Sequence, residues 1–180
     1  MGSLAALTIH QADDLDLVGG VDPVGVGRSL AAVVSGTDPE LRISGHLAGA
    51  IEDLQPDILV DFTAPAVVMS NLETALKAGV ACVVGTTGFS TTDLQLVAKW
   101  CELRHTPAII APNFSLGAIL MMQFAARAAK VFDYAEIIEY HHEAKKDSPS
   151  GTAVKTAEMM AAARGKAFRV GGLVEPGSVK

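Results

Sequence analysis

The sequence has 180 residues, of which 49% are hydrophobic, 5% aromatic and 19% charged, a composition typical of an α/β protein and not of a disordered or fibrous chain. The net charge of −6 is unevenly distributed, because residues 1–110 hold 5 Lys and Arg against 13 Asp and Glu, whereas residues 111–180 hold 9 against 7. An acidic first part argues against a nucleic-acid partner, since phosphate binding needs clustered cations, and the cations of the second part favour a small anionic ligand.

Membrane and metal binding are not expected from the sequence. No apolar run reaches the ~18 residues that a membrane helix needs, and the first six residues lack the basic head of a secretory signal. We therefore expect a cytoplasmic protein without a membrane partner. Cys82 and Cys101 are too few for a disulfide framework or a metal site, and we interpret both as small core residues.

The first part of the chain alternates strand and helix patterns. The predicted strands lie within 15–22 and begin at Asp57 (DILVDFT), Ala81 (ACVVGTT) and Ala108 (AIIAPNF), and the predicted helices span 3–11, 65–77 and 91–104. Pro65 in the first turn and Gly79 just past the end are typical helix boundaries. No element is predicted for residues 23–49. The alternation predicts an α/β fold with a Rossmann-like, doubly wound parallel sheet.

The pattern changes after Asn113. Residues 115–132 predict a long apolar helix, residues 135–142 alternate as in a strand, and residues 151–164 again predict a helix. We place a domain boundary at this change, with residues 1–114 in the first domain and residues 115–180 in the second, as part of an α+β domain.

Small and hydroxyl-bearing residues follow the predicted parallel strands. In an open parallel sheet, the ligand binds beyond the carboxyl ends of the strands. Three strand ends carry such residues, and they begin with Asp61, Phe62 and Thr63, with Gly85, Thr86 and Thr87, and with Ala111, Pro112, Asn113 and Phe114. A nucleotide would lie close to this backbone, with Thr86 and Asn113 as hydrogen-bond partners, and Asp22 ends its strand where a dinucleotide fold places the acid that binds ribose. The alternative that these are ordinary turn residues stays open.

The stretch EYHHEAKKDSPSGTA, residues 139–153, concentrates imidazole and ammonium groups. Neighbouring side chains of a strand point to opposite faces, so His141 and His142 are poorly placed to bind one metal ion, and the stretch lacks the second histidine of the H-E-x-x-H zinc signature. One histidine beside Lys145 and Lys146 is instead suited to act as a general acid on an anionic substrate.

The end of the same stretch predicts a helix start. Ser150 or Ser148 would cap the helix, and the backbone N–H groups of Gly151 and Thr152 would face an anion at the positive end of the helix dipole. The alternative is a plain capped helix preceded by solvated lysines.

Together with VDFTAP, VVGTTGF and APNFSLG, this stretch resembles the dihydrodipicolinate reductases, and the block His-His-x-x-Lys-x-Asp-x-Pro-Ser-Gly-Thr is highly specific. The resemblance implies that residues 1–114 are part of a dinucleotide-binding domain and that residues 115–180 are part of a substrate-binding and tetramerisation domain. It implies an oxidoreductase that reduces 4-hydroxy-tetrahydrodipicolinate to tetrahydrodipicolinate in the diaminopimelate route to lysine. NADH or NADPH would be the cofactor, with the choice left open, and the full-length form would be a homotetramer.

The resemblance also implies roles for individual residues. His141 would be the general acid and Lys145 its catalytic partner. The substrate would contact His142, Ser150, Gly151 and Thr152. The cofactor would contact Asp22 at its ribose and, on the nicotinamide side, Gly85, Thr86, Thr87, Ala111, Pro112, Asn113 and Phe114.

The sequence departs from the family at both ends. Family members open with Gly-x-x-Gly-x-Met-Gly, of which Met1-Gly2 resemble the last two residues, and they continue past Lys180. We therefore expect a piece of a reductase that lacks the first strand and most of the phosphate loop, with an open sheet edge. Two alternatives stay open. One is a non-catalytic remnant that binds a dicarboxylate or assembles with full-length subunits, and the other is a different nucleotide-linked oxidoreductase, against which the double histidine argues.

Overall fold

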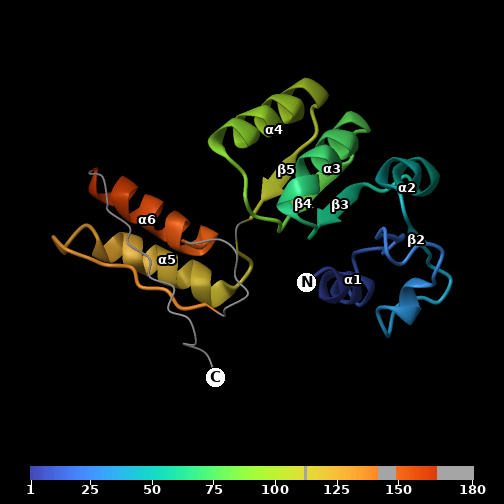
Figure 1. Ribbon diagram of the computed structural model, residues 1–180, viewed down its shortest axis with the longest axis horizontal. Coiled ribbons are helices and arrows are strands. Elements are labelled where there is room, and N and C mark those ends of the chain that lie inside the picture. Colours follow the sequence, from blue (N-terminus) through green and yellow to red (C-terminus); the bar gives the residue numbers. More distant parts are fainter. Residues whose placement is uncertain (112, 142–148, 166–180) are drawn as a thin grey trace. The chain divides into compact units, whose positions relative to one another are not determined.

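The computed structural model describes residues 1–111, 113–141 and 149–165. The chain divides into two compact units, Met1–Ala111 and Pro112–Lys180. Strands and helices alternate in the first unit, and two long helices dominate the second (Figure 1). Within these described ranges, every helix is too short or too polar to cross a membrane.

The first unit is built around parallel strands. Its elements are α1 (Gly2–His10), β1 (Gly20–Val21), the short 3-10 helix η1 (Leu30–Ala32), β2 (Ile43–Ser44), α2 (Leu47–Leu54), β3 (Ile58–Asp61), α3 (Pro65–Lys77), β4 (Ala81–Val84), α4 (Thr91–Arg104) and β5 (Ala108–Ile110). Strands β3, β4 and β5 form one parallel sheet in that order, and α3 and α4 lie together over one face of it (Figure 1). The α/β, Rossmann-like architecture is therefore confirmed, and α3 and α4 have the predicted bounds.

Local signals explain why α4 begins where the sequence predicts it. The Ser90 side chain accepts a hydrogen bond from the Asp93 N–H at 3.1 Å, and the Asp93 carboxylate accepts from the Ser90 N–H at 2.8 Å. This reciprocal capping box satisfies two donors that the first helical turn leaves without partners. The Ser90 hydroxyl also donates to the Asp93 carboxylate at 2.7 Å, and this bond, together with the one from the Ser90 N–H, holds the pKa of Asp93 below its usual range.

Residues 15–49 are where the sequence-based prediction was incomplete. The strand expected within 15–22 is only the two-residue β1, and it pairs in parallel with β2, which was not predicted. Helix α2 was also missed, although its apolar residues Leu47, Ala50, Ile51 and Leu54 have helical spacing. It spans eight residues, and its N-cap is His46, whose side chain makes no capping hydrogen bond, so neither length nor a start signal marked it.

The five strands fall into two sheets, β1–β2 and β3–β4–β5. In a doubly wound dinucleotide-binding sheet, the first strand lies between the second strand and the fourth, with the third beyond the second and the fifth and sixth beyond the fourth. In this protein β1 and β2 correspond to the second and third strands of that order, and β3, β4 and β5 to the fourth, fifth and sixth. The place of the general first strand is then between β1 and β3. No described residue forms a strand at this place.

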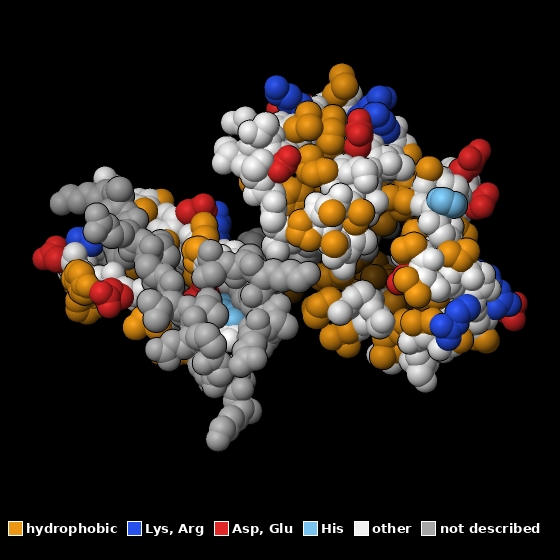
Figure 2. Space-filling view, viewed as in Figure 1, with side chains coloured by type: hydrophobic (Ala, Val, Ile, Leu, Met, Phe, Trp, Pro, Cys, Tyr) orange, Lys and Arg blue, Asp and Glu red, His pale blue; other side chains and the backbone are white. Residues whose placement is uncertain are grey.

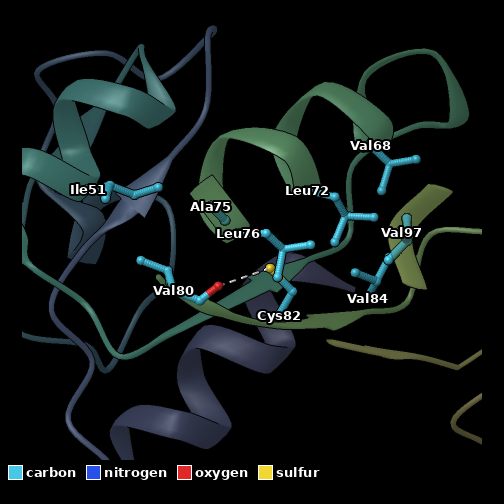
Figure 3. Close-up of a cluster of buried hydrophobic side chains, with 9 residues drawn as sticks. All are labelled: Ile51, Val68, Leu72, Ala75, Leu76, Val80, Cys82, Val84 and Val97. Atoms are coloured by element: carbon cyan, nitrogen blue, oxygen red, sulfur yellow. Dashed lines mark hydrogen bonds between the residues drawn. The ribbon is translucent and has the colours of Figure 1, made fainter. Parts of the chain in front are cut away.

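The main core of the first unit lies between α3, α4 and the three-stranded sheet. Its buried side chains are Ile51, Val68, Leu72, Ala75, Leu76, Val80, Cys82, Val84 and Val97 (Figure 3). Cys82 is buried and Cys101 is partly buried against this cluster, as expected of small core residues. Burial raises the pKa of the Cys82 thiol to about 12, so the thiol stays protonated and unreactive at neutral pH.

The second unit contains α5 (Leu116–Ala128) and α6 (Gly151–Arg164), both at predicted places. The two helices pack against each other, and the small residues Ala153 and Ala157 of α6 and Ala129, directly after α5, are buried. Ser115 and Ser150 cap the two helices through hydrogen bonds from the N–H three residues ahead. The cap predicted at Ser150 or Ser148 is therefore Ser150, and Ser148 lies outside the described residues.

The strand predicted at 135–142 is not assigned as a strand. Residues 135–141 alternate between partly buried and exposed side chains, as an extended chain does, but they make no ladder with any described residue. The partly buried side chains are those of Ala135, Ile137, Glu139 and His141, so the two-residue alternation of an extended chain is present. A strand also needs a hydrogen-bonded neighbour, and the period of a single segment carries no information about one.

Candidate functional site

The second unit has a cavity of about 580 Å³, open to solvent, between α5, the extended segment 134–141 and α6. Its polar and charged lining residues are Tyr134, Glu136, Glu139, His141, Ser150, Thr152 and Thr156. Its apolar wall includes Met121, Phe132 and Met160. The structure thus brings together the predicted general acid His141 and the predicted substrate-binding residues Ser150 and Thr152.

The N-terminus of α6 forms the polar end of this cavity. Ser150 is buried, its N–H donates to Glu139 Oε1 at 2.7 Å, and its hydroxyl donates to Glu139 Oε2 while accepting from the Ala153 N–H at 3.1 Å. The Ser150 side chain is therefore fully engaged inside the protein. The N–H groups of Gly151 and Thr152 have no acceptor among the described residues, so they remain suited to an anionic ligand.

Asn113 connects the starts of the two helices. Its Nδ2 donates to Thr152 Oγ1 at 3.0 Å, and its Oδ1 accepts from the Ser115 N–H at 2.7 Å. The sequence suggested Asn113 as a hydrogen-bond partner for a nucleotide, but both ends of its amide are used within the second unit. The exposed Phe114 follows it, and Pro112 lies outside the described residues.

His141 lies at the end of the extended segment and lines the cavity. Its Nδ1 is buried without a hydrogen bond and lies 3.7 Å from Glu139 Oε2, while the whole side chain is 30% exposed. The exposed part of the ring is therefore away from Nδ1. His142 and Lys145, the other two residues predicted to act beside it, lie outside the described residues.

The carboxyl edge of the three-stranded sheet holds a buried carboxylate, which the sequence analysis placed at a strand end without giving it a role. Asp61, only 3% exposed, accepts through Oδ1 from the Thr63 N–H (2.9 Å), the Thr63 hydroxyl (2.7 Å) and the Thr86 hydroxyl (2.9 Å). Its Oδ2 accepts from Asn71 Nδ2 at 2.8 Å. The Thr86 hydroxyl was expected to be available to a nucleotide, and the structure directs it to Asp61 instead.

Packing also explains Gly85, the next predicted cofactor residue. A Cβ atom on Gly85 would lie 2.1 Å from Cε1 of the Phe62 ring, so only glycine allows the ring to lie against this backbone. The two strand-end loops are therefore held together by a hydrogen bond and by direct packing. Thr87 and Gly88 beyond them are exposed, and Gly88 has a φ of +96°, which favours glycine.

Asp22 and Ala111 complete the predicted cofactor residues. Asp22 is exposed directly after β1, and its Oδ1 accepts from the Val24 N–H at 2.7 Å. Its second oxygen has no partner among the described residues and can accept from a ribose hydroxyl. The Ala111 N–H donates to the Val84 carbonyl at 2.9 Å, which extends the pairing of β4 and β5 by one residue.

The first unit thus defines the chain as a Rossmann-like α/β protein, and the second adds an anion-suited cavity with a histidine in its wall. Family models described as "Dihydrodipicolinate reductase, N-terminus" and "Dihydrodipicolinate reductase, C-terminus" match residues 1–114 and 117–178. The chain belongs to the dihydrodipicolinate reductase family, as the sequence motifs predicted, and in this family the N-terminal domain binds NAD(P)H.

Individual relatives agree with this assignment. The chain is 45% identical over 164 residues to the 4-hydroxy-tetrahydrodipicolinate reductase of Listeria monocytogenes serotype 4b (strain F2365), covering 91% of this chain and 62% of the relative. It is 46% identical over 162 residues to that of Moorella thermoacetica, covering 90% and 61%. The chain therefore spans about 62% of the length of the curated relatives that it matches.

A solved structure also matches. The dipicolinate-bound dihydrodipicolinate reductase from Paenisporosarcina sp. TG-14 superimposes with a TM-score of 0.71 at 31% sequence identity. The match covers 97% of this chain and 74% of that one.

Proposed function

We propose that this chain is part of a 4-hydroxy-tetrahydrodipicolinate reductase, which reduces 4-hydroxy-tetrahydrodipicolinate to tetrahydrodipicolinate with NADH or NADPH in the diaminopimelate route to lysine. In this proposal, residues 1–114 belong to the cofactor-binding domain and residues 115–180 to the substrate-binding and tetramerisation domain. The observation that carries the proposal is that His141 lines the same cavity as the amide-rich N-terminus of α6.

The substrate is a ring with two carboxylates, and the cavity offers groups that suit it. The N–H groups of Gly151 and Thr152 donate to one carboxylate at the positive end of the α6 dipole. His141 lines the cavity, and we assign the remaining positive charge to His142 and Lys145, which lie outside the described residues. The dipicolinate bound to the related reductase supports a ligand of this chemistry.

The residues at the sheet edge suit a dinucleotide. Thr87 and Gly88 expose their backbone there, and Asp22 keeps one carboxylate oxygen open for a ribose hydroxyl. When bound, the reduced nicotinamide supplies a hydride. His141 donates the proton that completes the reduction, and the 4-hydroxyl group of the substrate leaves as water. The helix N-terminus stabilises the negative charge of the ring's carboxylates.

An activity assay tests this proposal. The chain is assayed for NADH and NADPH oxidation with freshly made substrate, next to a version extended at its N-terminus by the strand and glycine loop of a relative and at its C-terminus to the relatives' length. The extended version is expected to be active, and His141→Ala in it to lower kcat by about 100-fold to 10,000-fold. An inert extended protein, or an unchanged kcat in the variant, would overturn the assignment.

The second candidate is a chain that binds a dicarboxylate without catalysis, and the separation of the β1–β2 and β3–β4–β5 sheets favours it for the sequence as given. Titration calorimetry with pyridine-2,6-dicarboxylate distinguishes binding from turnover. Gly151→Pro is expected to weaken binding about 10-fold to 100-fold, because it removes one N–H donor from the anion. Proline is tolerated at the first helical position, and Ser150 has the extended backbone (φ −67°, ψ 154°) that precedes a proline.

The matched control is Gly151→Ala, which keeps the N–H group and is expected to bind as the unchanged chain does. Equal affinities of the proline and alanine variants would contradict the role of this amide. No heat of binding in any of the three proteins would eliminate the second candidate.

We also propose that the full-length form is a homotetramer. Large apolar side chains of the second unit are exposed, among them Phe124 and Ile138, and hydrophobic atoms reach the visible surface there (Figure 2). Light scattering on the extended version checks the assembly, and a monomer would contradict it.

A further inference from the structure

Glu139 is a carboxylate in the cavity wall that the proposed reduction does not yet use. Its side chain is 9% exposed, although an isolated buried carboxylate is costly. Both of its oxygens accept hydrogen bonds from Ser150, one from the N–H and one from the hydroxyl. This explains how the carboxylate is tolerated, and it anchors the extended segment to the start of α6.

The same carboxylate faces His141. Residues 139 and 141 are two apart in an extended segment, so their side chains lie on one face, and both are partly buried there. His141 Nδ1 lies 3.7 Å from Glu139 Oε2, is buried, and makes no hydrogen bond. Tyr134 and Glu136, the other titratable groups that the described cavity wall contains, bond to each other instead.

This arrangement decides which nitrogen of His141 carries a proton. A neutral imidazole has one N–H, and a carboxylate can only accept. With the proton on Nδ1, a small rotation brings it into a hydrogen bond with Glu139. With the proton on Nε2, the lone pair of Nδ1 would face a carboxylate with no proton between them. The Nδ1–H form is therefore favoured, and the exposed part of the ring presents Nε2.

We propose that Glu139 is a positioning residue, which selects the Nδ1–H tautomer of His141 so that Nε2 is the nitrogen that exchanges a proton with a ligand. The inference rests on the proposed function for its catalytic meaning. A proton that leaves Nε2 for the substrate leaves the imidazole neutral with its proton on Nδ1, which is the form that Glu139 holds. The acid is then ready to be protonated again at Nε2 without a ring flip.

The tautomer of His141 can be measured without an activity assay. Long-range ¹H–¹⁵N correlation NMR spectra are recorded on the ¹⁵N-labelled 180-residue chain, at a pH where the histidine rings are neutral. His141→Gln assigns the signals by their loss. We expect the unchanged chain to show the Nδ1–H form at His141. A predominant Nε2–H form would overturn the proposal, and this measurement needs no further variant.

Two variants separate positioning from helix capping. Glu139→Gln replaces an acceptor by an amide that can donate to Nδ1, so we expect the tautomer to shift toward Nε2–H. Ser150→Ala removes a hydrogen-bond donor to Glu139 but leaves the carboxylate, so we expect Nδ1–H to persist. The same shift in both variants would show that Glu139 acts only through the cap, and a shift in neither would show that Glu139 does not select the tautomer. Either result would overturn the proposal.

In the extended, active version, Glu139→Gln is expected to lower kcat about 10-fold to 100-fold, as the loss of an orienting partner commonly does, with the KM for the cofactor unchanged. A Nδ1–H tautomer in an extended version that has no reductase activity would refute the proposed function and leave the role of Glu139 standing. An extended version that is active but shows the Nε2–H tautomer at His141 would support the proposed function and refute the role of Glu139.

Discussion

Replacing Asp61 with alanine is expected to unfold the first unit or to lower its free energy of unfolding by about 3–5 kcal/mol. The carboxylate accepts four hydrogen bonds at the carboxyl edge of the sheet, from Thr63, Asn71 and Thr86. Alanine leaves these donors without their acceptor in a buried site. Chemical unfolding followed by circular dichroism measures the loss.

A matched control lies at the other end of the same strand. Asp57 directly precedes β3 and is exposed, so Asp57→Ala is expected to change the free energy of unfolding by at most about 0.5 kcal/mol. The exchange Asp61→Asn with Asn71→Asp keeps an acceptor for the threonines and reverses the direction of the Asn71 bond. It is expected to be more stable than Asp61→Ala. Equal stability of the Asp61→Ala and Asp57→Ala proteins would refute the role of the buried carboxylate.

Gly85→Ala is expected to destabilise the first unit by about 1–3 kcal/mol, because it places a methyl group inside the space of an aromatic ring. The added Cβ would lie 2.1 Å from Cε1 and 2.5 Å from Cδ1 of Phe62, so the ring has to move. Thermal unfolding measures the effect. Gly49→Ala is the control, because nothing lies within 4 Å of its Cβ position in α2, and it is expected to stabilise the protein by about 0.5–1 kcal/mol.

A double mutant locates the cause of the Gly85 effect. Phe62→Ala removes the ring that the new methyl group would meet, so Gly85→Ala is expected to cost less in that background, with a coupling of about 0.5–3 kcal/mol. Additive effects of the two substitutions would mean that strain at Gly85 arises from its own backbone and not from the ring. The same contact sets the position of the loop that leads to Thr87.

Local patterns predicted much of this protein. The bounds of α3 were predicted from Pro65 and Gly79, and the start of α6 from a cap at Ser150 or Ser148. The Ser90–Asp93 capping box, which was not used in the prediction, is a local signal of the same kind for α4. These signals act between neighbours along the chain, so a sequence displays them directly. Helix α2 and strand β2 were missed because each is short and lacks such a signal.

The site was only partly predictable. His141, Ser150 and Thr152 were expected in one pocket, and the structure places them around one cavity. Thr86 and Asn113 were predicted as hydrogen-bond partners of a nucleotide, and the structure shows both bonded within the protein. Their partners, Asp61 and Thr152, were not foreseen, because they lie 25 and 39 residues away along the chain.

The amino-acid sequence by itself determined the Rossmann-like α/β fold, the family and the start of each long helix, since periodicity, caps and motifs are properties of adjacent residues. Only the tertiary structure decided that the Glu139 carboxylate accepts hydrogen bonds from Ser150 and faces His141. It also decided that hydrogen bonds to Asp61 hold two strand-end loops together. The physical reason is that a hydrogen bond is short and directional, so its distant partners are selected only when packing brings their atoms together.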